Sequence, residues 1–174
     1  EMEALRKGLT QILPHRDRSG RTVLLNVGQV NQQYDIRVVL RIAFYVMMMT
    51  LRNSQQQQSH QHHQQEDDSQ KKGVVLVYFA FGQTKVPLSR TMAYYNVLRA
   101  LPVKVVATHM CRYGDDSDGN VFKVALKYCA EIIEKSRLCR WRSHAGTKIE
   151  VMYRLMTFGI LKEALPLTPD GDLD

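Results

Sequence analysis

This 174-residue chain lacks long hydrophobic runs and any obvious disulfide framework. Its longest apolar run, residues 42–49, is well short of the roughly 17–25 residues that a membrane-spanning helix needs. The N-terminal segment EMEALRKGLTQIL mixes charges and has no secretory signal pattern. The three cysteines are odd in number and scattered, which favours reduced thiols. We therefore expect a cytoplasmic protein without a transmembrane helix.

Enzyme motifs are also missing. The glycines form no GxxxxGK or GxGxxG phosphate loop, and there is no GxSxG nucleophile elbow. His109 and Cys111 share a face of one expected strand, but no third group that could orient them is evident in the sequence. A core histidine and a buried thiol are the favoured interpretation. The segment 115–120, DDSDGN, is typical of a helix-capping turn rather than of a calcium loop. We expect no enzymatic activity, no metal and no cofactor.

Charge is unbalanced toward the basic side. Lysine and arginine total 24 against 17 acidic residues, for a net charge of +7. Such a balance is compatible with nucleic acid or with an anionic membrane surface. Arg140 and Arg142 share one face of an expected strand, and Trp141 points to the other. These arginines suit either a solvated face or a site for a lipid phosphate. Aromatic residues do not interleave with the basic ones, so nucleic-acid binding is the least favoured alternative.

Strand-like and helix-like segments alternate along the chain. This order predicts an α/β domain with a mainly parallel sheet. Thr147 and Glu150 form a capping-box pattern at the start of the last helix, and Gly159 suits the position just after its end. Residues 1–13 are interpreted as the end of a helix. The expected strands are residues 21–30, 73–82, 103–110 and 138–143, and the expected helices are residues 34–52, 87–101, 121–133 and 147–158.

Residues 53–72 are a low-complexity tract, rich in glutamine and histidine, with no apolar residue to bury. The composition predicts a disordered loop between two ordered elements. His60, His62 and His63 suggest a metal site, but no cysteine or carboxylate stands at ligand spacing from them. A tolerated surface insertion is the favoured interpretation.

The expected helix 121–133, VFKVALKYCAEII, is apolar over more of its circumference than one core face requires. Only Lys123, Lys127 and Glu131 interrupt it, as one thin polar stripe. The additional apolar surface must face a second layer, a partner, a membrane or a bound apolar ligand.

Several segments, in this order, resemble the CRAL-TRIO lipid-binding domain of retinaldehyde-, tocopherol- and phosphatidylinositol-transfer proteins. GRTVLLNV resembles the opening strand of that family, with Thr22 in place of proline. KGVVLVYFAFG resembles its central strand. LPVKVV resembles its Tyr-Pro-Glu-Arg corner, with Val103 in place of glutamate, and FGILKEALP resembles its closing motif, with Leu161 in place of proline. The resemblance covers residues 20–174, and residues 1–19 would be an N-terminal helical remnant and turn.

The resemblance implies a three-layer α/β fold with a mixed, mainly parallel sheet and a hydrophobic pocket closed by a mobile apolar gate helix, residues 121–133. It implies a ligand that is a lipid or another hydrophobic molecule, transient contact with a membrane surface, and no specific nucleic acid. Arg137 would match a headgroup-binding basic residue, although Glu134 does not match the hydroxyl of phosphoinositide-binding members. A protein-interaction module of the same fold with a collapsed pocket is the alternative. The expected gate and pocket residues are Phe122, Ala125, Leu126, Cys129, Ile133, Val77, Phe79, Val105 and Ala107.

Overall fold

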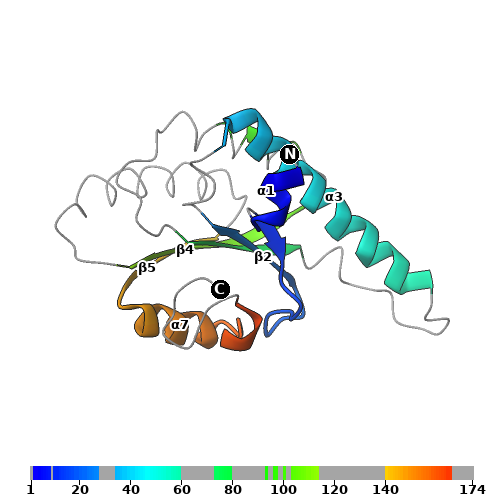
Figure 1. Ribbon diagram of the computed structural model, residues 1–174. Helices are drawn as coiled ribbons and strands as arrows, with labels where there is room; N and C mark the ends of the chain where they lie inside the picture. Colours follow the sequence, from blue (N-terminus) through cyan, green and yellow to red (C-terminus); the bar gives the residue numbers. More distant parts are fainter. Residues whose placement is uncertain are drawn as a thin grey trace.

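The computed structural model of the chain has a mixed β-sheet between helices, and Figure 1 shows its elements in chain order. The structure describes residues 2–8, 10–27, 34–59, 73–79, 103–113 and 140–165, together with positions 93, 96, 97 and 100. Every structural statement below concerns these residues.

The sheet has five strands in the order β1-β2-β3-β4-β5. Strand β1 (Thr10–Ile12) is antiparallel to β2 (Thr22–Val27). Strands β2, β3 (Val74–Phe79), β4 (Val105–Tyr113) and β5 (Arg140–Gly146) are parallel neighbours. The runs TVLLNV and VVLVYF are apolar at nearly every position, as expected for parallel strands buried on both faces. The predicted mixed and mainly parallel sheet is confirmed.

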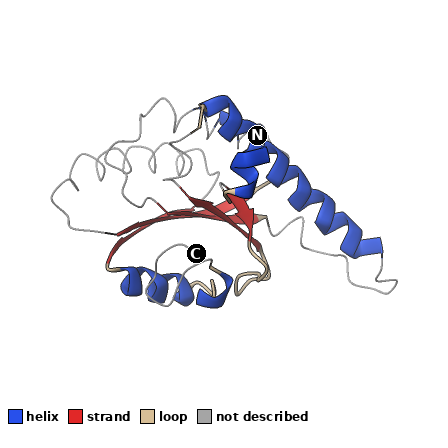
Figure 2. Ribbon diagram, in the orientation of Figure 1, coloured by secondary structure: helices blue, strands red, loops and turns tan. Residues whose placement is uncertain are grey.

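Helices cover the sheet on both faces (Figure 2). Helix α3 (Ile36–Ser59) lies on one face, and α7 (Lys148–Thr157) lies on the other. The short helix α1 (Met2–Arg6) packs on the α3 side through Leu5. We call the two surfaces of the sheet the α3 face and the α7 face. The α/β architecture predicted from the alternating elements is thus present, with helices on both faces of the sheet.

Alternation along the strands gives each face its own core. Leu24, Val74 and Leu76 pack with Val39, Ile42, Val46 and Met47 of α3. Leu25, Val75, Val77 and Phe79 pack with Val151 and Leu155 of α7. Successive side chains of a strand point to opposite faces, so the central strands β2 and β3 contribute to both cores.

Helix α7 is the element whose ends the sequence predicts in detail. Thr147 Oγ1 accepts a hydrogen bond from Glu150 N–H, and a Glu150 carboxylate oxygen accepts one from Thr147 N–H, which completes the capping box. At the other end, Gly159 has φ +80°, and Ile160 N–H donates to the Leu155 carbonyl. This is the Schellman arrangement, in which a left-handed glycine closes the helix. A short 3₁₀ turn, η2 (Lys162–Ala164), follows.

Three expectations need correction. Residues 1–13 are not one helical end, because Thr10–Ile12 pair with β2 as an edge strand. Helix α3 continues to Ser59, so the first seven residues of the tract 53–72 are helical rather than disordered. Strand β4 extends to Tyr113, three residues beyond its expected end. The rest of that tract, and the expected helices 87–101 and 121–133, lie outside the described residues, apart from four positions between 93 and 100.

None of the helices in the described ranges is both long enough and apolar enough to cross a bilayer.

Candidate functional site

The four strand residues expected in a pocket do not share one face of the sheet. Val77, Phe79 and Ala107 belong to the core under α7, whereas Val105 packs into the core under α3. A β-bulge explains the division between the two β4 residues. Val74 pairs with Val105 and Val75 pairs with Ala107, so Val106 is an extra residue in β4. The bulge reverses the alternation that would otherwise put Val105 and Ala107 on the same face.

The remaining expected site residues lie outside the described part of the chain. They are the gate residues Phe122, Ala125, Leu126, Cys129 and Ile133, and the headgroup candidate Arg137.

The α7 face contains a polar pair within its core. His109 of β4 and His144 of β5 are both buried, and His109 Nδ1 lies 2.9 Å from His144 Nε2. Their ring planes differ by 10° and their centroids are 5.1 Å apart. Because the facing nitrogens are much closer than the ring centres, the rings meet edge to edge and share an N–H···N hydrogen bond. One imidazole donates and the other accepts.

Burial keeps this pair neutral. Burial is the largest of the effects that lower the pKa of His109 to about 3; His144 and the nearby cations Arg142 and Arg21 act in the same direction, and Asp17 opposes them. The pKa of His144 is also lowered, first by burial and then by Arg154 and Arg142. A proton added to either ring would lie in a poorly solvated, already cationic environment.

Aromatic and cationic groups surround the histidines. Phe158, just after α7, has its ring centroid 4.7 Å from that of His109 in an edge-to-face contact. The Arg142 guanidinium lies over the Phe158 ring, 4.2 Å from its centroid. Arg154 Nη1 donates to the Ala145 carbonyl at 2.7 Å. Arg142 therefore stacks beneath the end of α7 and does not form part of a fully solvated outer face.

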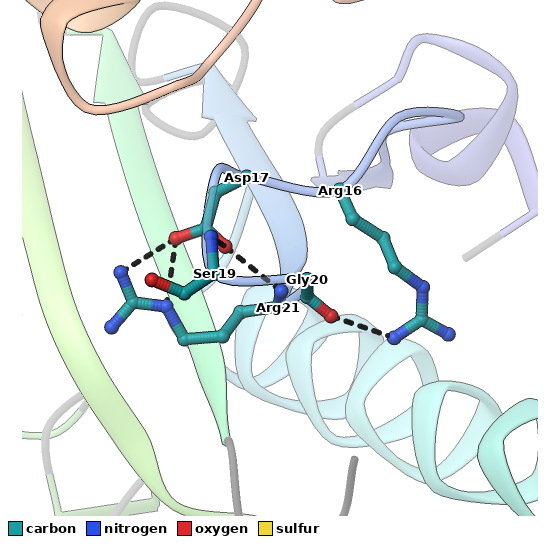
Figure 3. A network of polar contacts seen from close by, with 5 residues as sticks. All are labelled: Arg16, Asp17, Ser19, Gly20 and Arg21. Atoms are coloured by element: carbon teal, nitrogen blue, oxygen red, sulfur yellow. Dashed lines mark hydrogen bonds and ion pairs between the residues drawn. The ribbon is translucent and has the colours of Figure 1, made fainter.

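The loop before β2 closes the same region (Figure 3). The buried Asp17 carboxylate accepts hydrogen bonds from the backbone N–H groups of Ser19 and Arg21, at 3.0 and 2.8 Å. Its second oxygen accepts a hydrogen bond from Arg21 Nε at 2.7 Å and forms an ion pair with Arg21 Nη2 at 2.6 Å. Arg16 Nη1 donates to the Gly20 carbonyl at 3.0 Å. The segment before β2 is thus a rigid, hydrogen-bonded loop.

Cys111 is next to this cluster on β4 and is fully buried. Burial raises the pKa of its thiol, which keeps the sulfur protonated and a poor nucleophile. The structure therefore agrees with the interpretation of His109 and Cys111 as core residues. No group of three or more potential metal ligands occurs among the residues that the structure describes.

Sequence reasoning identified His109 but missed its partner. His144 lies 35 residues further along the chain, and its register partner in β4 is Cys111. The only signal available was a second histidine one residue beyond the expected strand 138–143, and without the strand register nothing connects the two.

The α3 face has a different character near β5. Tyr78, Met110 and Trp141, from three adjacent strands, form a small apolar cluster of their own. Tyr78 is the register partner of Met110, and Trp141 is that of the buried Thr108. We call these three residues the apolar floor. As predicted, Trp141 and Arg142 point to opposite faces of β5.

No family model matches this chain, and no curated protein matches it significantly.

Proposed function

We propose that this chain is a binding module for a hydrophobic small molecule or phospholipid, built on the CRAL-TRIO plan, and that it transfers its ligand between membranes. The ligand would lie on the α3 face, between the apolar floor and a lid formed by residues 121–133. Holding such a ligand requires burial of its chains, at about 0.8 kcal/mol per CH₂, and no bond chemistry. The protein would act in the cytoplasm and contact membranes transiently.

The direction of chain connection supports this choice of face. Strands β2 to β5 are parallel and adjacent in chain order, so every connection between them steps in the same direction. Parallel crossovers share one handedness. Helix α3, which connects β2 to β3, lies on the α3 face, so the connection from β4 to β5 is expected on that face too. Residues 121–133 belong to that connection.

The apolar floor is the observation that carries the proposal. Tyr78, Met110 and Trp141 extend the apolar surface of the α3 face from the core under α3 to the edge strand β5. A two-sided apolar helix expected above such a surface is the arrangement that a lipid cavity needs. Val105 lies on this face, whereas Val77, Phe79 and Ala107 support the opposite core. Within the proposal, the strand residues of the pocket are therefore Tyr78, Val105, Met110 and Trp141.

Native mass spectrometry tests the proposal. The purified protein is incubated with vesicles of mixed phospholipids, recovered, and weighed intact. We expect one lipid bound per chain. Ala125→Trp, which adds bulk to the proposed lid, should abolish uptake while the circular dichroism spectrum is kept. Ala100→Trp adds the same bulk at an exposed position and should leave uptake unchanged. If no lipid co-purifies and none is taken up, the proposal is wrong.

A protein-interaction module with a collapsed pocket is the second candidate. The size of the floor side chains favours it, because tyrosine, methionine and tryptophan can fill the space under a lid by themselves. In that case the protein would bind no lipid, and Ala125→Trp would leave partner binding unchanged.

A further inference from the structure

The outer surface of α3 combines exposed apolar side chains with arginines. Phe44 is 51% exposed, Tyr45 is 53% exposed and Met48 is 38% exposed. Arg37, Arg41 and Arg52 are exposed on the same helix. Large apolar side chains that gather on one exposed face mark an interaction site more often than single exposed ones do. We call these six residues the α3 stripe.

Helix geometry gathers the stripe on one side. At 3.6 residues per turn, the six residues fall within an arc of about 100°. The buried residues Val39, Ile42, Val46 and Met47 lie on the opposite side, against the sheet. The stripe runs about 22 Å along the helix, at 1.5 Å per residue. Figure 1 shows α3 crossing one face of the sheet and continuing past its edge.

The charge of α3 is of one sign. Its 24 residues contain three arginines, all in the stripe, and no aspartate, glutamate or lysine. Arg37 and Arg41 are at the N-terminal end of the stripe and Arg52 is at its other end, with Phe44, Tyr45 and Met48 between them. The whole chain has a net charge of +7. A partner that fits this surface must accept apolar side chains in its centre and supply negative charge around them.

We propose that the α3 stripe docks the protein on a membrane surface that contains anionic lipids. Aromatic and apolar side chains enter the boundary between headgroups and acyl chains, and arginines contact phosphates while their stems remain in apolar surroundings. Each basic residue near an anionic leaflet contributes attraction that salt screens. The inference deepens the proposed function, since transfer requires contact with a membrane, but it depends on residues of α3 that do not form the pocket.

Vesicle co-sedimentation tests the stripe. Vesicles of phosphatidylcholine alone are compared with vesicles containing 30% phosphatidylserine, at low and high salt. Wild-type protein should bind the anionic vesicles and be released by salt. Phe44→Ser with Met48→Ser should weaken binding by at least about tenfold. Ile149→Ser with Tyr153→Ser, at positions 57% and 65% exposed on α7, removes comparable apolar surface elsewhere and should leave binding unchanged.

A second pair of variants tests the charge. Arg37→Gln with Arg41→Gln should reduce binding to anionic vesicles and flatten its salt dependence. Lys104→Gln with Lys162→Gln removes the same charge from exposed positions outside α3 and should have a smaller effect. Circular dichroism and thermal unfolding confirm that every variant folds. Equal losses from both pairs would show a general charge effect and overturn the assignment to α3.

Two other results would also overturn the inference. The first is vesicle binding that is absent, or that the apolar α3 variant does not change. The second is a wild-type dimer in sedimentation velocity that the same variant dissociates, which would make the stripe an interface between two copies of this chain. Lipid uptake is scored separately by native mass spectrometry. Vesicle binding without any bound lipid would refute the proposed pocket and support membrane docking by the α3 stripe. Bound lipid without vesicle binding would support the pocket and refute docking by the stripe.

Discussion

His109 and His144 share a hydrogen bond of 2.9 Å across adjacent parallel strands, within the core under α7. The hydrogen bond between two buried imidazoles requires that one of the two facing nitrogens carries no proton, because two N–H groups facing each other would repel. Arg142, Arg154 and Arg21 add positive charge around them, and Asp17 opposes it. The packing of α7 on the sheet is therefore linked to pH.

Acid should destabilise the protein before its carboxylates are protonated. The unfolded chain takes up protons on histidine below about pH 6.5, whereas folded His109 resists protonation until about pH 3. The unfolded state thus binds more protons in this window. The free energy of unfolding is therefore undiminished by His109 above about pH 6.5. Below that pH it falls by about 1.4 kcal/mol per pH unit for His109 alone, as the pH drops toward 3. Urea unfolding between pH 7.5 and 4 measures this slope.

Two variants isolate the pair. His109→Gln with His144→Gln should lower stability at pH 7.5 but flatten its dependence on pH. His15→Gln changes an exposed histidine and should keep the wild-type slope. A wild-type stability that stays constant down to pH 5 would contradict the linkage.

The carboxylate of Asp17 should be one of the costliest polar groups to alter. Its two oxygens accept three hydrogen bonds, one of them from Arg21 Nε, and Arg21 Nη2 forms an ion pair with the same carboxylate. Asp17→Asn keeps the shape but removes the charge and turns one acceptor into a donor that faces Arg21. We expect a loss of about 2–3 kcal/mol in the free energy of unfolding, because a buried charged partner loses its counterion.

The matched control is Glu163→Gln. Glu163 lies 4.0 Å from Lys162, with both side chains exposed. Exposed ion pairs contribute about 0–1 kcal/mol, so this variant should be nearly neutral in the same urea titration. Similar losses in the two variants would show that the Asp17 loop is not the rigid element described above.

The sequence predicted the parts of this fold that local rules determine. The capping box of Thr147 and Glu150, the glycine that ends α7 and the apolar run of β3 are each encoded within a few residues. Local rules failed where the structure of a segment depends on the strand that it pairs with. The segment 10–12 is too short to show a strand period, and it is a strand only because β2 offers an edge.

The candidate site divides in the same way. The burial of His109 follows from its place in an apolar strand, but its partner depends on the register between β4 and β5. The separation of Val105 from Ala107 depends on one extra residue, Val106, and no residue type announces a bulge there. Strict alternation would put Val105 and Ala107 on the same face of the sheet. The sequence alone therefore could not show that the expected pocket residues lie on two different faces.

Gly159 should be more sensitive to substitution than a glycine with the same backbone conformation elsewhere. Gly159 and Gly8 have φ of +80° and +67°, a region that costs an L-residue about 1–2 kcal/mol. A Cβ at Gly159 would also meet the backbone nitrogen of Arg18, which cannot move without disturbing the Asp17 loop. A Cβ at Gly8 would meet only the end of the Gln11 side chain, which can turn away.

We therefore expect Gly159→Ala to cost clearly more than Gly8→Ala, by about 1 kcal/mol or more beyond the shared backbone strain. Thermal and urea unfolding of the two variants give the difference directly. Equal losses would mean that the loop before β2 yields easily, and that the contact between Arg18 and the end of α7 does not constrain it.

Trp141 gives the proposed pocket a built-in probe, because it is the only tryptophan of the chain and it lies in the apolar floor. Phospholipids with brominated acyl chains quench indole fluorescence only at short range. Loading the protein with such a lipid, and then removing free vesicles, should quench the emission of Trp141 relative to the same lipid without bromine. Bromine near the carboxyl end and bromine near the methyl end of the chain should quench to different extents, since the floor contacts one part of a fixed ligand.

The Phe44→Ser and Met48→Ser variant is the control for this measurement. It changes two apolar residues of the α3 stripe and none of the floor, so lipid that has already been loaded should quench Trp141 as it does in the wild type. Quenching that disappears in this variant would place the lipid on the outer surface of α3. A bound lipid that quenches in neither protein would lie away from the apolar floor, since Trp141 belongs to that cluster on the α3 face and is separate from the core under α7.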